Sequence, residues 1–549
     1  MQQRITINLN TDSKKTDKTT ILEYCRSHGI AGIETPCGGK GTCGKCKVTV
    51  TKPYYKDVLA CQTKICDGME IIVGRKESTG TKEDSMVVLT NGGSISEKFN
   101  EHVNSNVVLK EETANESEKV ESNEDTLAAC DIGTTTVVCY LIDKETGQII
   151  STRSGANPQR SFGADVLSRI DAAARADDND KANGGLQMMQ TQIVSLLNSW
   201  ISEMLTECGR TKVSRFSVAG NTVMCHLLMG ISPEKMGKAP FLPDEYFGRE
   251  YNPLDIGLEN CQTMIIFPAV SGFVGGDITA GMMETVNCNE LTLYLDIGTN
   301  GEMALGKGDR YVCCATAAGP AFEGAQIELG MPASKGAVDK VWLEGRRIKY
   351  SVIGNDRPVG LCGSGLIDAL AVLLKAGIID ENGTILSGQE LPILFRSYVF
   401  EVEAEEAAQS TEPSLAVHIA PGVYITQEDI RKLQLAKGAI AAGIEVLFKE
   451  YGCKPCDLDV LTFAGGFGNY IDKASAAAIG LFPQELLDKV KEVGNAAGNG
   501  AVSAALSQEA WERALEISGN MRYIELASYP HFNEMYLSLI HISEPTRHS

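Results

Sequence analysis

The sequence predicts an α/β protein made of a small cysteine-bearing module, an acidic linker and a large duplicated region. Three observations carry this prediction. Cysteines gather in the glycine-rich stretch PCGGKGTCGKC (36–46), acidic residues crowd residues 91–125, and the tetrapeptide DIGT occurs at 131–134 and again at 296–299. A chain of 549 residues is long enough for two or three domains with a sizeable core.

Residues 1–76 are predicted to form the small module. RITINLN alternates apolar and polar residues with the period of a half-buried strand. Thr20 and Glu23 form a capping-box pattern that opens a short helix, ILEYCRSHG. The runs KVTV and MEIIV supply further strands, so the module is expected to be a small sheet with one helix.

Four cysteines of this module have the spacing C-x5-C-x2-C-x14-C; they are Cys37, Cys43, Cys46 and Cys61. Four thiolates hold an iron–sulfur cluster, and its sulfur atoms accept hydrogen bonds from nearby groups. Glycines between the cysteines let backbone N–H groups approach, because they carry no Cβ. Zinc is an alternative, but it prefers paired C-x2-C knuckles, and one pair is present. Cys66 is an alternative fourth ligand, and Cys25 is expected to be buried in the core.

The three-cysteine loop resembles that of plant-type and adrenodoxin-type 2Fe–2S ferredoxins. This resemblance implies a β-grasp fold that holds a 2Fe–2S cluster. In that family the fourth cysteine usually lies farther downstream than Cys61 does here. The region that follows, residues 77–126, is expected to be an acidic flexible linker. Nine acidic residues face three lysines within 91–125, and such a segment buries too little apolar surface to fold.

Residues 127–536 carry the features of a nucleotide site. Each DIGT lies between apolar, β-rich runs, and a third glycine turn occurs in VLTFAGGFGNYID (460–472). Glycines let backbone N–H groups reach phosphate oxygens, and hydroxyl and amide side chains add donors. The predicted nucleotide-binding residues are Gly133, Thr134, Thr135, Gly298, Thr299, Asn300, Gly465 and Gly466.

Carboxylates beside these turns are candidates for catalysis. Asp131 and Asp296 would bind Mg²⁺ through water or orient the attacking water, as phosphoryl transfer requires. Glu323, in the loop AAGPAFEGAQIELG, is a possible general base or metal-water ligand. The alternative for each aspartate is a turn-capping role. Asp277, Glu302 and the turn GLCGSGLIDAL (360–370) are equally well explained by structure.

Together these motifs resemble the ASKHA superfamily of actin, sugar kinases and heat-shock ATPases. The resemblance implies a duplicated RNase H-like, actin-like ATPase domain, with two subdomains around a cleft that binds ATP with Mg²⁺. Other residues favour ordinary roles. His226 is expected in the core, Cys313, Cys314 and Cys362 are expected to pack, and the pair Cys453 and Cys456 is interpreted as incidental.

Composition excludes several classes of partner. The formal net charge of −21 argues against nucleic acid or an anionic membrane, since both attract basic surfaces. Seventeen cysteines behind a polar N-terminus predict a reducing cytoplasm. No uncharged apolar run of about 18 residues occurs, so no transmembrane helix is expected.

The complete order of motifs resembles the ferredoxin-containing reductive activators of corrinoid proteins, found in anaerobes. The resemblance implies ATP-dependent reduction of a corrinoid protein from Co(II) to Co(I) by one electron from the cluster. It also implies a low-potential donor, such as a reductase or ferredoxin. Some members have a folded middle domain between ferredoxin and ATPase, and this chain is expected to have only the acidic linker there, which leaves a homodimer open.

Three other functions fit parts of the pattern. The chain could activate a different low-potential enzyme, act as a redox-gated nucleotide-binding sensor, or be a sugar kinase with an appended ferredoxin. Residues 537–549 are treated separately, because LSLIHISEPTR (537–547) matches a translated transposon adapter used in sequencing libraries. They are expected to be a non-native tail.

Overall fold

The computed structural model describes residues 3–7, 19–27, 30, 33, 39, 46–52, 55–73, 125–174, 184–298, 300–324, 326–402, 414–465 and 470–542. They form two compact units. The first holds the described residues up to 266, and the second begins at Phe267. The predicted linker, residues 77–126, lies outside the described residues except at its last two positions.

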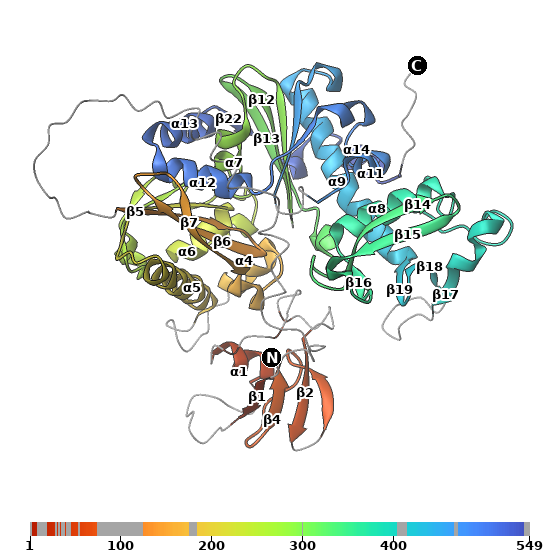
Figure 1. Cartoon of the computed structure of the whole chain (residues 1–549), viewed down its shortest axis with the longest axis horizontal. Coiled ribbons are helices and arrows are strands. Elements are labelled where there is room, and N and C mark those ends of the chain that lie inside the picture. Colours follow the sequence, from red (N-terminus) through yellow and green to blue (C-terminus); the bar gives the residue numbers. More distant parts are fainter. Residues whose placement is uncertain are drawn as a thin grey trace, which may run out of the picture. The chain divides into compact units, whose positions relative to one another are not determined.

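The N-terminal module of the first unit is a four-stranded antiparallel sheet with one helix (Figure 1). In sheet order the strands are β1 (Gln3–Thr6), β4 (Glu70–Val73), β2 (Lys47–Lys52) and β3 (Lys56–Leu59), and the helix is α1 (Ile21–Ser27). The predicted capping box is confirmed, because Glu23 N donates to Thr20 Oγ1 at 3.2 Å and Thr20 N donates to Glu23 Oε2 at 2.7 Å. Cys25 is buried as expected.

The rest of the first unit is built on a six-stranded sheet. In sheet order its strands are β7 (Ile149–Ala156), β6 (Thr136–Asp143), β5 (Thr126–Ile132), β8 (Val213–Gly220), β10 (Cys261–Ile266) and β9 (Arg249–Tyr251). The first three strands form an antiparallel meander, and β8 then pairs parallel to β5. The helices of this unit are α4 (Val166–Ala174), α5 (Gly185–Glu207) and α6 (Thr222–Met229).

The second unit contains another six-stranded sheet. In sheet order its strands are β21 (Val490–Glu492), β20 (Val460–Ala464), β11 (Thr292–Ile297), β12 (Gly301–Lys307), β13 (Arg310–Thr316) and β22 (Met521–Tyr523). Here too a three-stranded antiparallel meander is followed by a strand, β20, that pairs parallel to the first strand of the meander. The two sheets therefore share their strand order over five strands, as a duplication predicts.

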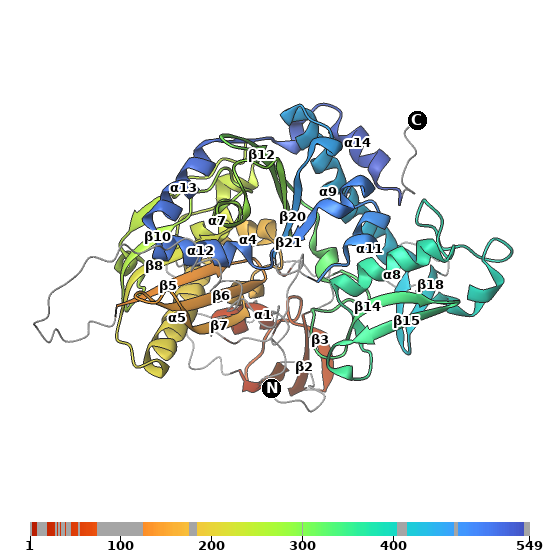
Figure 2. The same cartoon turned by 45° about the horizontal axis from the view of Figure 1, so that its top comes forward.

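Two smaller sheets are inserted in the second unit (Figure 2). They consist of β14 (Ala337–Glu344), β15 (Arg347–Val352) and β16 (Gly360–Leu361), and of β17 (Val399–Val402), β18 (Ser414–Ala420) and β19 (Val423–Thr426). The helices are α7 (Gly276–Thr285), α8 (Gly363–Lys375), α9 (Gln427–Tyr451), α11 (Lys473–Ala478), α12 (Ala496–Leu506), α13 (Gln508–Gly519) and α14 (Phe532–Leu539). Helix α9 packs against β12 and β13, and α8 packs against β14.

Short 3-10 helices connect these elements; they are η2 (Pro158–Ser161), η4 (Glu234–Gly237), η5 (Pro253–Ile256), η6 (Pro320–Glu323), η7 (Ile353–Asn355), η8 (Ile393–Tyr398), η9 (Pro455–Asp457), η10 (Gln484–Lys489) and η11 (Leu526–Ser528). None of the helices that the structure describes is both long and apolar enough to span a bilayer. Ile542, in the predicted non-native tail, is buried, and its N–H donates to Glu381 O at 2.8 Å. Packing does not reveal the origin of these residues, so a foreign origin stays a prediction.

Candidate phosphate loops and cluster site

The first predicted phosphate loop follows β5, a buried strand that is paired on both sides within the sheet. Asp131 is the second-to-last residue of this strand and is partly exposed, as are Thr134 and Thr135. Gly133 N donates to Thr136 O at 3.0 Å and closes a tight turn. A Cβ on Gly133 would lie 2.7 Å from that same oxygen, so the turn requires glycine.

A buried arginine and a buried asparagine hold this loop from behind. Asn157 Nδ2 donates to Gly133 O at 2.8 Å, and Asn157 N donates to Thr135 O at 2.9 Å. Arg169, which is fully buried, donates from Nη2 to Thr134 O. These bonds occupy the carbonyl oxygens of the loop. They therefore fix its backbone from one side, as a preorganised anion-binding turn requires.

The structure adds a second turn beside this loop that sequence reasoning missed. Asp131 is paired with Ala219 on β8, which ends at Gly220. Asn221 follows and caps α6, with its side chain accepting from Val223 N at 3.0 Å. A Cβ on Gly220 would lie 2.9 Å from Ile132 O, so β8 and the phosphate loop approach each other closely.

The second predicted phosphate loop follows the first strand of the meander in the second unit, and its aspartate has the same register as Asp131. Asp296 lies near the end of β11 and pairs with Ala464 on β20, as Asp131 pairs with Ala219. Gly465 comes next and has a φ of +83°. A Cβ at that position would lie 2.4 Å from Asp296 Oδ1. The AGG turn and the second DIGT loop are therefore in direct contact, which the sequence pattern did not reveal.

Carboxylates gather around this second loop. Gly298 N donates to Asn300 O at 2.9 Å and forms the turn. Glu323 directs Oε1 to within 4.0 Å of the point that a Cβ on Gly298 would occupy. Glu302, which is buried, pairs with Asp296 across β11 and β12. Burial raises the pKa of Asp296 to about 6 from its ordinary value of 3.8.

Two predicted residues of this loop system, Thr299 and Gly466, lie outside the described residues. The other predicted residues lie on the two DIGT turns, except Gly465, which follows β20, and their role in nucleotide binding stays a prediction. Each DIGT turn places a glycine beside a carboxylate, and this arrangement suits a phosphate group with a divalent cation. Gly465 leaves room for the Asp296 carboxylate, because a Cβ at that position would clash with Oδ1.

Cys46 and Cys61 lie together in the N-terminal module. Their Sγ atoms are 3.2 Å apart. Gly39, in the cysteine loop, has a φ of +88°, and a Cβ there would lie 3.8 Å from Cys61 Cβ and 3.0 Å from Leu22 Cδ2. Two thiols at this separation, beside a close-packed glycine, fit two ligands of one iron. Cys66 is exposed, while Cys37 and Cys43 lie outside the described residues.

The residues expected to have ordinary roles do so. His226 is fully buried; its Nδ1 lies 2.8 Å from Thr222 O, and Nε2 accepts from Glu245 N at 3.3 Å. Cys313 and Cys314 are fully buried, and burial raises the pKa of each thiol. Cys362 is also buried, with its Sγ 3.4 Å from Val338 O.

The turn GLCGSGLIDAL is a packing element as well. Ser364 Oγ donates to Asp339 O at 2.8 Å, next to the start of α8. A Cβ on Gly365 would lie 2.2 Å from Val338 O, so the helix start is pressed against β14. Of the two readings offered by the sequence, phosphate binding or packing, the geometry favours packing.

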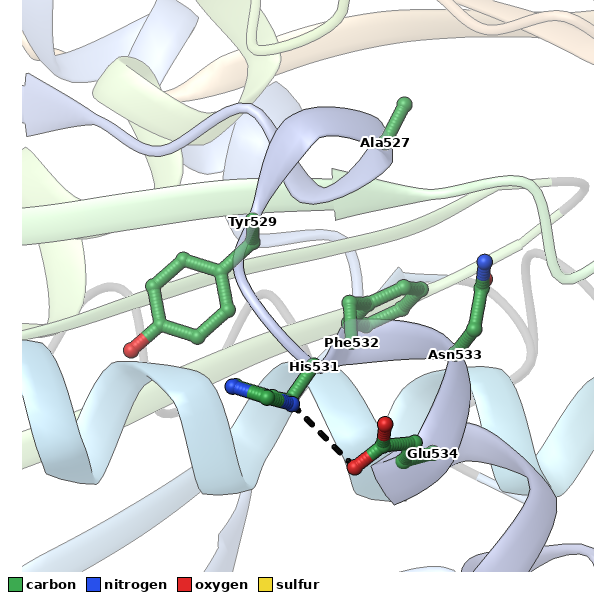
Figure 3. Close-up of a pocket in the computed structure, with 6 residues that line it drawn as sticks. All are labelled: Ala527, Tyr529, His531, Phe532, Asn533 and Glu534. Atoms are coloured by element: carbon green, nitrogen blue, oxygen red, sulfur yellow. Dashed lines mark hydrogen bonds and ion pairs between the residues drawn. The ribbon is translucent and has the colours of Figure 1, made fainter.

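A surface pocket at the C-terminal end of the second unit is separate from these residues. It has a volume of about 220 Å³ and is lined by Ala527, Tyr529, His531, Phe532, Asn533 and Glu534 (Figure 3). His531 Nδ1 lies 3.2 Å from Glu534 Oε2, and both side chains are exposed. None of the predicted site residues lines it.

Three protein-family models match the chain. The 2Fe–2S iron–sulfur cluster binding domain matches residues 7–66, the RACo middle region matches 127–287, and the C-terminal domain of RACo, the ASKHA domain, matches 290–547. The expectation that a middle region is missing is therefore wrong. Both halves of 127–536 carry the same strand order and the same DIGT motif, so the sequence pattern does not mark a middle region apart from the rest.

Individual relatives agree. The chain is 33% identical to the corrinoid activation enzyme RamQ of Eubacterium limosum over 95% of each chain. It is 26% identical to the [Co(II) methylated amine-specific corrinoid protein] reductase of Methanosarcina barkeri, covering 74% of this chain and 75% of that one. A solved structure of a reductive activator for corrinoid, iron–sulfur protein is 29% identical over 97% of both chains, with a TM-score of 0.67. The chain belongs to the RACo family of reductive activators of corrinoid proteins.

Proposed function

We propose that this protein reduces the cobalt of a corrinoid protein from Co(II) to Co(I) at the expense of ATP. A 2Fe–2S cluster, when bound, supplies the single electron. The family membership and the names of two relatives, both of which act on corrinoid proteins, support this function. The observation that carries it is that one chain holds two neighbouring thiols and two DIGT turns whose aspartates each lie opposite an alanine of the adjacent parallel strand.

Each proposed site residue has a task. Cys37, Cys43, Cys46 and Cys61 would hold the cluster, with Cys61 preferred over Cys66 because its thiol lies beside Cys46. The backbone of both DIGT loops would bind phosphate oxygens, assisted by Thr134, Thr135, Thr299 and Asn300. Asp131, Asp296 and Glu323 would hold Mg²⁺ through water or orient the attacking water. Gly465 and Gly466 would admit the adenosine to close backbone contact.

The energetics explain why ATP is needed. Plant-type ferredoxin clusters have potentials near about −400 mV. Co(I) corrinoids are harder to form than that, and for one electron each ~59 mV of deficit makes the transfer about tenfold less favourable. ATP binding or hydrolysis can offset such a deficit if the nucleotide favours one conformation of the complex. The redox and nucleotide sites share one chain because both must act on the same partner.

The test is anaerobic. Reconstituted protein, a reductant and a Co(II) corrinoid protein are mixed, and the Co(I) absorbance band is followed with ATP, with a non-hydrolysable analogue and without nucleotide. We expect the band only with hydrolysable ATP. Failure with several corrinoid proteins, despite an intact cluster and bound ATP, would instead favour a redox-gated sensor or activation of another low-potential enzyme.

Three further expectations belong to this proposal. Residues 77–126 would act as a tether that lets the N-terminal module reach different partners. A low-potential reductase or ferredoxin would supply the electron. The protein would work in the cytoplasm, either as a monomer or as a homodimer.

A further inference from the structure

Arg26, in the last turn of α1, contacts the nucleotide-binding part of the first unit. Its Nε donates to Ser161 O at 2.9 Å, and its Nη2 donates to the same oxygen. Its guanidinium carbon lies 5.0 Å from the ring centroid of Phe162, which is buried. A guanidinium above an aromatic face with two hydrogen bonds to one carbonyl is a directional contact, which lysine would not reproduce.

The same guanidinium also lies near Gly39 of the cysteine loop. Arg26 Nη1 lies 3.9 Å from the point that a Cβ on Gly39 would occupy, and Cys61 Cβ lies 3.8 Å from that point. Gly39 can approach this closely because it has no side chain and adopts a left-handed φ of +88°. Arg26 therefore touches the surroundings of the proposed cluster and the backbone at Ser161 at once.

The backbone at Ser161 leads directly to the first phosphate loop. Residues 157–163 are tied to that loop at both ends. At one end, Asn157 bonds to Gly133 O and Thr135 O. At the other, Arg169 Nε donates to Gly163 O at 3.0 Å while its Nη2 reaches Thr134 O.

We propose that Arg26 is a positioning residue that couples the redox state of the cluster to nucleotide binding at the first phosphate loop. This rests on the proposed function for the presence of the two sites. Reduction would add one negative charge to a cluster held by Cys46 and Cys61, and this charge would change how firmly Arg26 holds Ser161 O and Phe162. Segment 157–163 transmits the change to the carbonyl oxygens of the phosphate loop.

Such coupling is reciprocal. If reduction changes the affinity for nucleotide by some factor, nucleotide must change the affinity for the electron by the same factor. Couplings between sites usually amount to about 5- to 150-fold. For one electron a tenfold factor corresponds to a shift of about 59 mV in midpoint potential. The ratio of nucleotide affinities in the two redox states and the nucleotide-dependent shift in midpoint potential must therefore agree.

The experiment needs no corrinoid partner. The midpoint potential of the reconstituted cluster is measured by spectroscopic redox titration with and without a non-hydrolysable ATP analogue. The dissociation constant of the analogue is measured separately on oxidised and reduced protein. We expect the wild type to show a difference of at least about fivefold in affinity, with a matching shift in potential.

Arg26→Ala should remove both differences while leaving the cluster spectrum and nucleotide binding in place. Arg26→Lys, which keeps the charge but loses the planar fork, should remove most of the coupling. Phe162→Leu removes the aromatic ring that Arg26 contacts and should likewise weaken the coupling. Lys64→Ala is the control. Lys64 is exposed and lies three positions from Cys61, and its replacement removes one positive charge, as Arg26→Ala does.

Two results would overturn the inference. The first is a wild type that binds the analogue equally in both redox states. The second is an Arg26→Ala protein whose nucleotide-dependent shift in potential equals that of the wild type. Absence of any nucleotide binding would instead contradict the proposed function, so the two failures are distinguishable.

Discussion

At the scale of single residues, the close approach of Gly465 to Asp296 organises the second predicted phosphate loop. The sequence predicted both residues, because each lies in a glycine turn after an apolar strand. It did not predict their contact, since that depends on the parallel register of Asp296 with Ala464 across β11 and β20. The sequence was enough to predict both residues, but the distance between them is determined by the fold.

We expect Gly465→Ala to weaken nucleotide binding about tenfold or more, equivalent to about 1.4 kcal/mol. The new methyl group would meet Asp296 Oδ1 at 2.4 Å and displace it. Gly452→Ala is a matched control, because Gly452 has a φ of +84° and no atom within 4 Å of the added Cβ. Both variants carry similar backbone strain, so equal nucleotide affinity in calorimetric titrations would show that the contact is unimportant.

The raised pKa of Asp296 makes a prediction for stability. Its folded pKa of about 6 exceeds the ordinary 3.8, so the fold favours the protonated form, and stability falls as pH rises from about 4 to 6. Asp296→Asn cannot ionise and should be more stable than wild type above pH 6, by about 1–3 kcal/mol. The difference should vanish near pH 4.

This difference is measured by thermal unfolding from pH 4 to 8 without nucleotide. Asp309→Asn, at an exposed turn between β12 and β13, makes the same chemical change as a control. A constant difference across that pH range would show that Asp296 does not titrate as inferred. The same Asp296→Asn variant should lose ATPase activity.

At the scale of elements, one strand pair in each unit carries a predicted phosphate loop. β5 with β8, and β11 with β20, each place a DIGT aspartate opposite the alanine of an AG turn. The repeated DIGT was visible in the sequence, but the turn at Gly220 was missed, because A-G-N is too short to stand out in a chain with 55 glycines. Aligning the two halves by strand order would have found it, with A-G-N opposite A-G-G.

The missed turn can be tested through Asn221. Asn221→Ala removes the cap of α6 and should cost about 1 kcal/mol of stability. It should also weaken nucleotide binding, because the side chain fixes the turn beside the first phosphate loop. Asn252→Ala removes a comparable cap from η5, where Asn252 accepts from Leu254 N at 3.2 Å, and should leave binding unchanged. Similar affinities in the two variants would remove Asn221 from the site.

At the scale of the whole molecule, the sequence predicted a 2Fe–2S domain followed by an ASKHA domain, and the family models match in that order. Cysteine spacing located the N-terminal module, whereas the acidic linker inferred from composition stays a prediction. The region from 127 onward appeared as a single domain because both halves obey the same strand pattern. The structure divides the chain into two units after Ile266, and the family models match a middle region at 127–287 and a C-terminal domain at 290–547.

Mixing two inactive variants tests whether one chain must carry both functions. Cys61→Ser should lose the cluster and retain nucleotide binding. Asp296→Asn should retain the cluster and lose ATPase activity. If the electron and its driving force must come from one chain, an equimolar mixture should produce no Co(I) band. Recovery of about a quarter or more of wild-type activity would indicate a homodimer whose chains complement one another.

The distribution of thiols has a practical consequence. Of the cysteines in the described part of the chain, Cys66, Cys288 and Cys456 are exposed, whereas Cys130, Cys313 and Cys314 are buried with a raised pKa. Thiolates react and thiols do not, so maleimide dyes should attach first to the exposed set. Cys66 belongs to the first unit and Cys288 to the second. With Cys456 replaced by serine, a donor and acceptor dye on this pair would report the separation of the two units in single molecules during turnover.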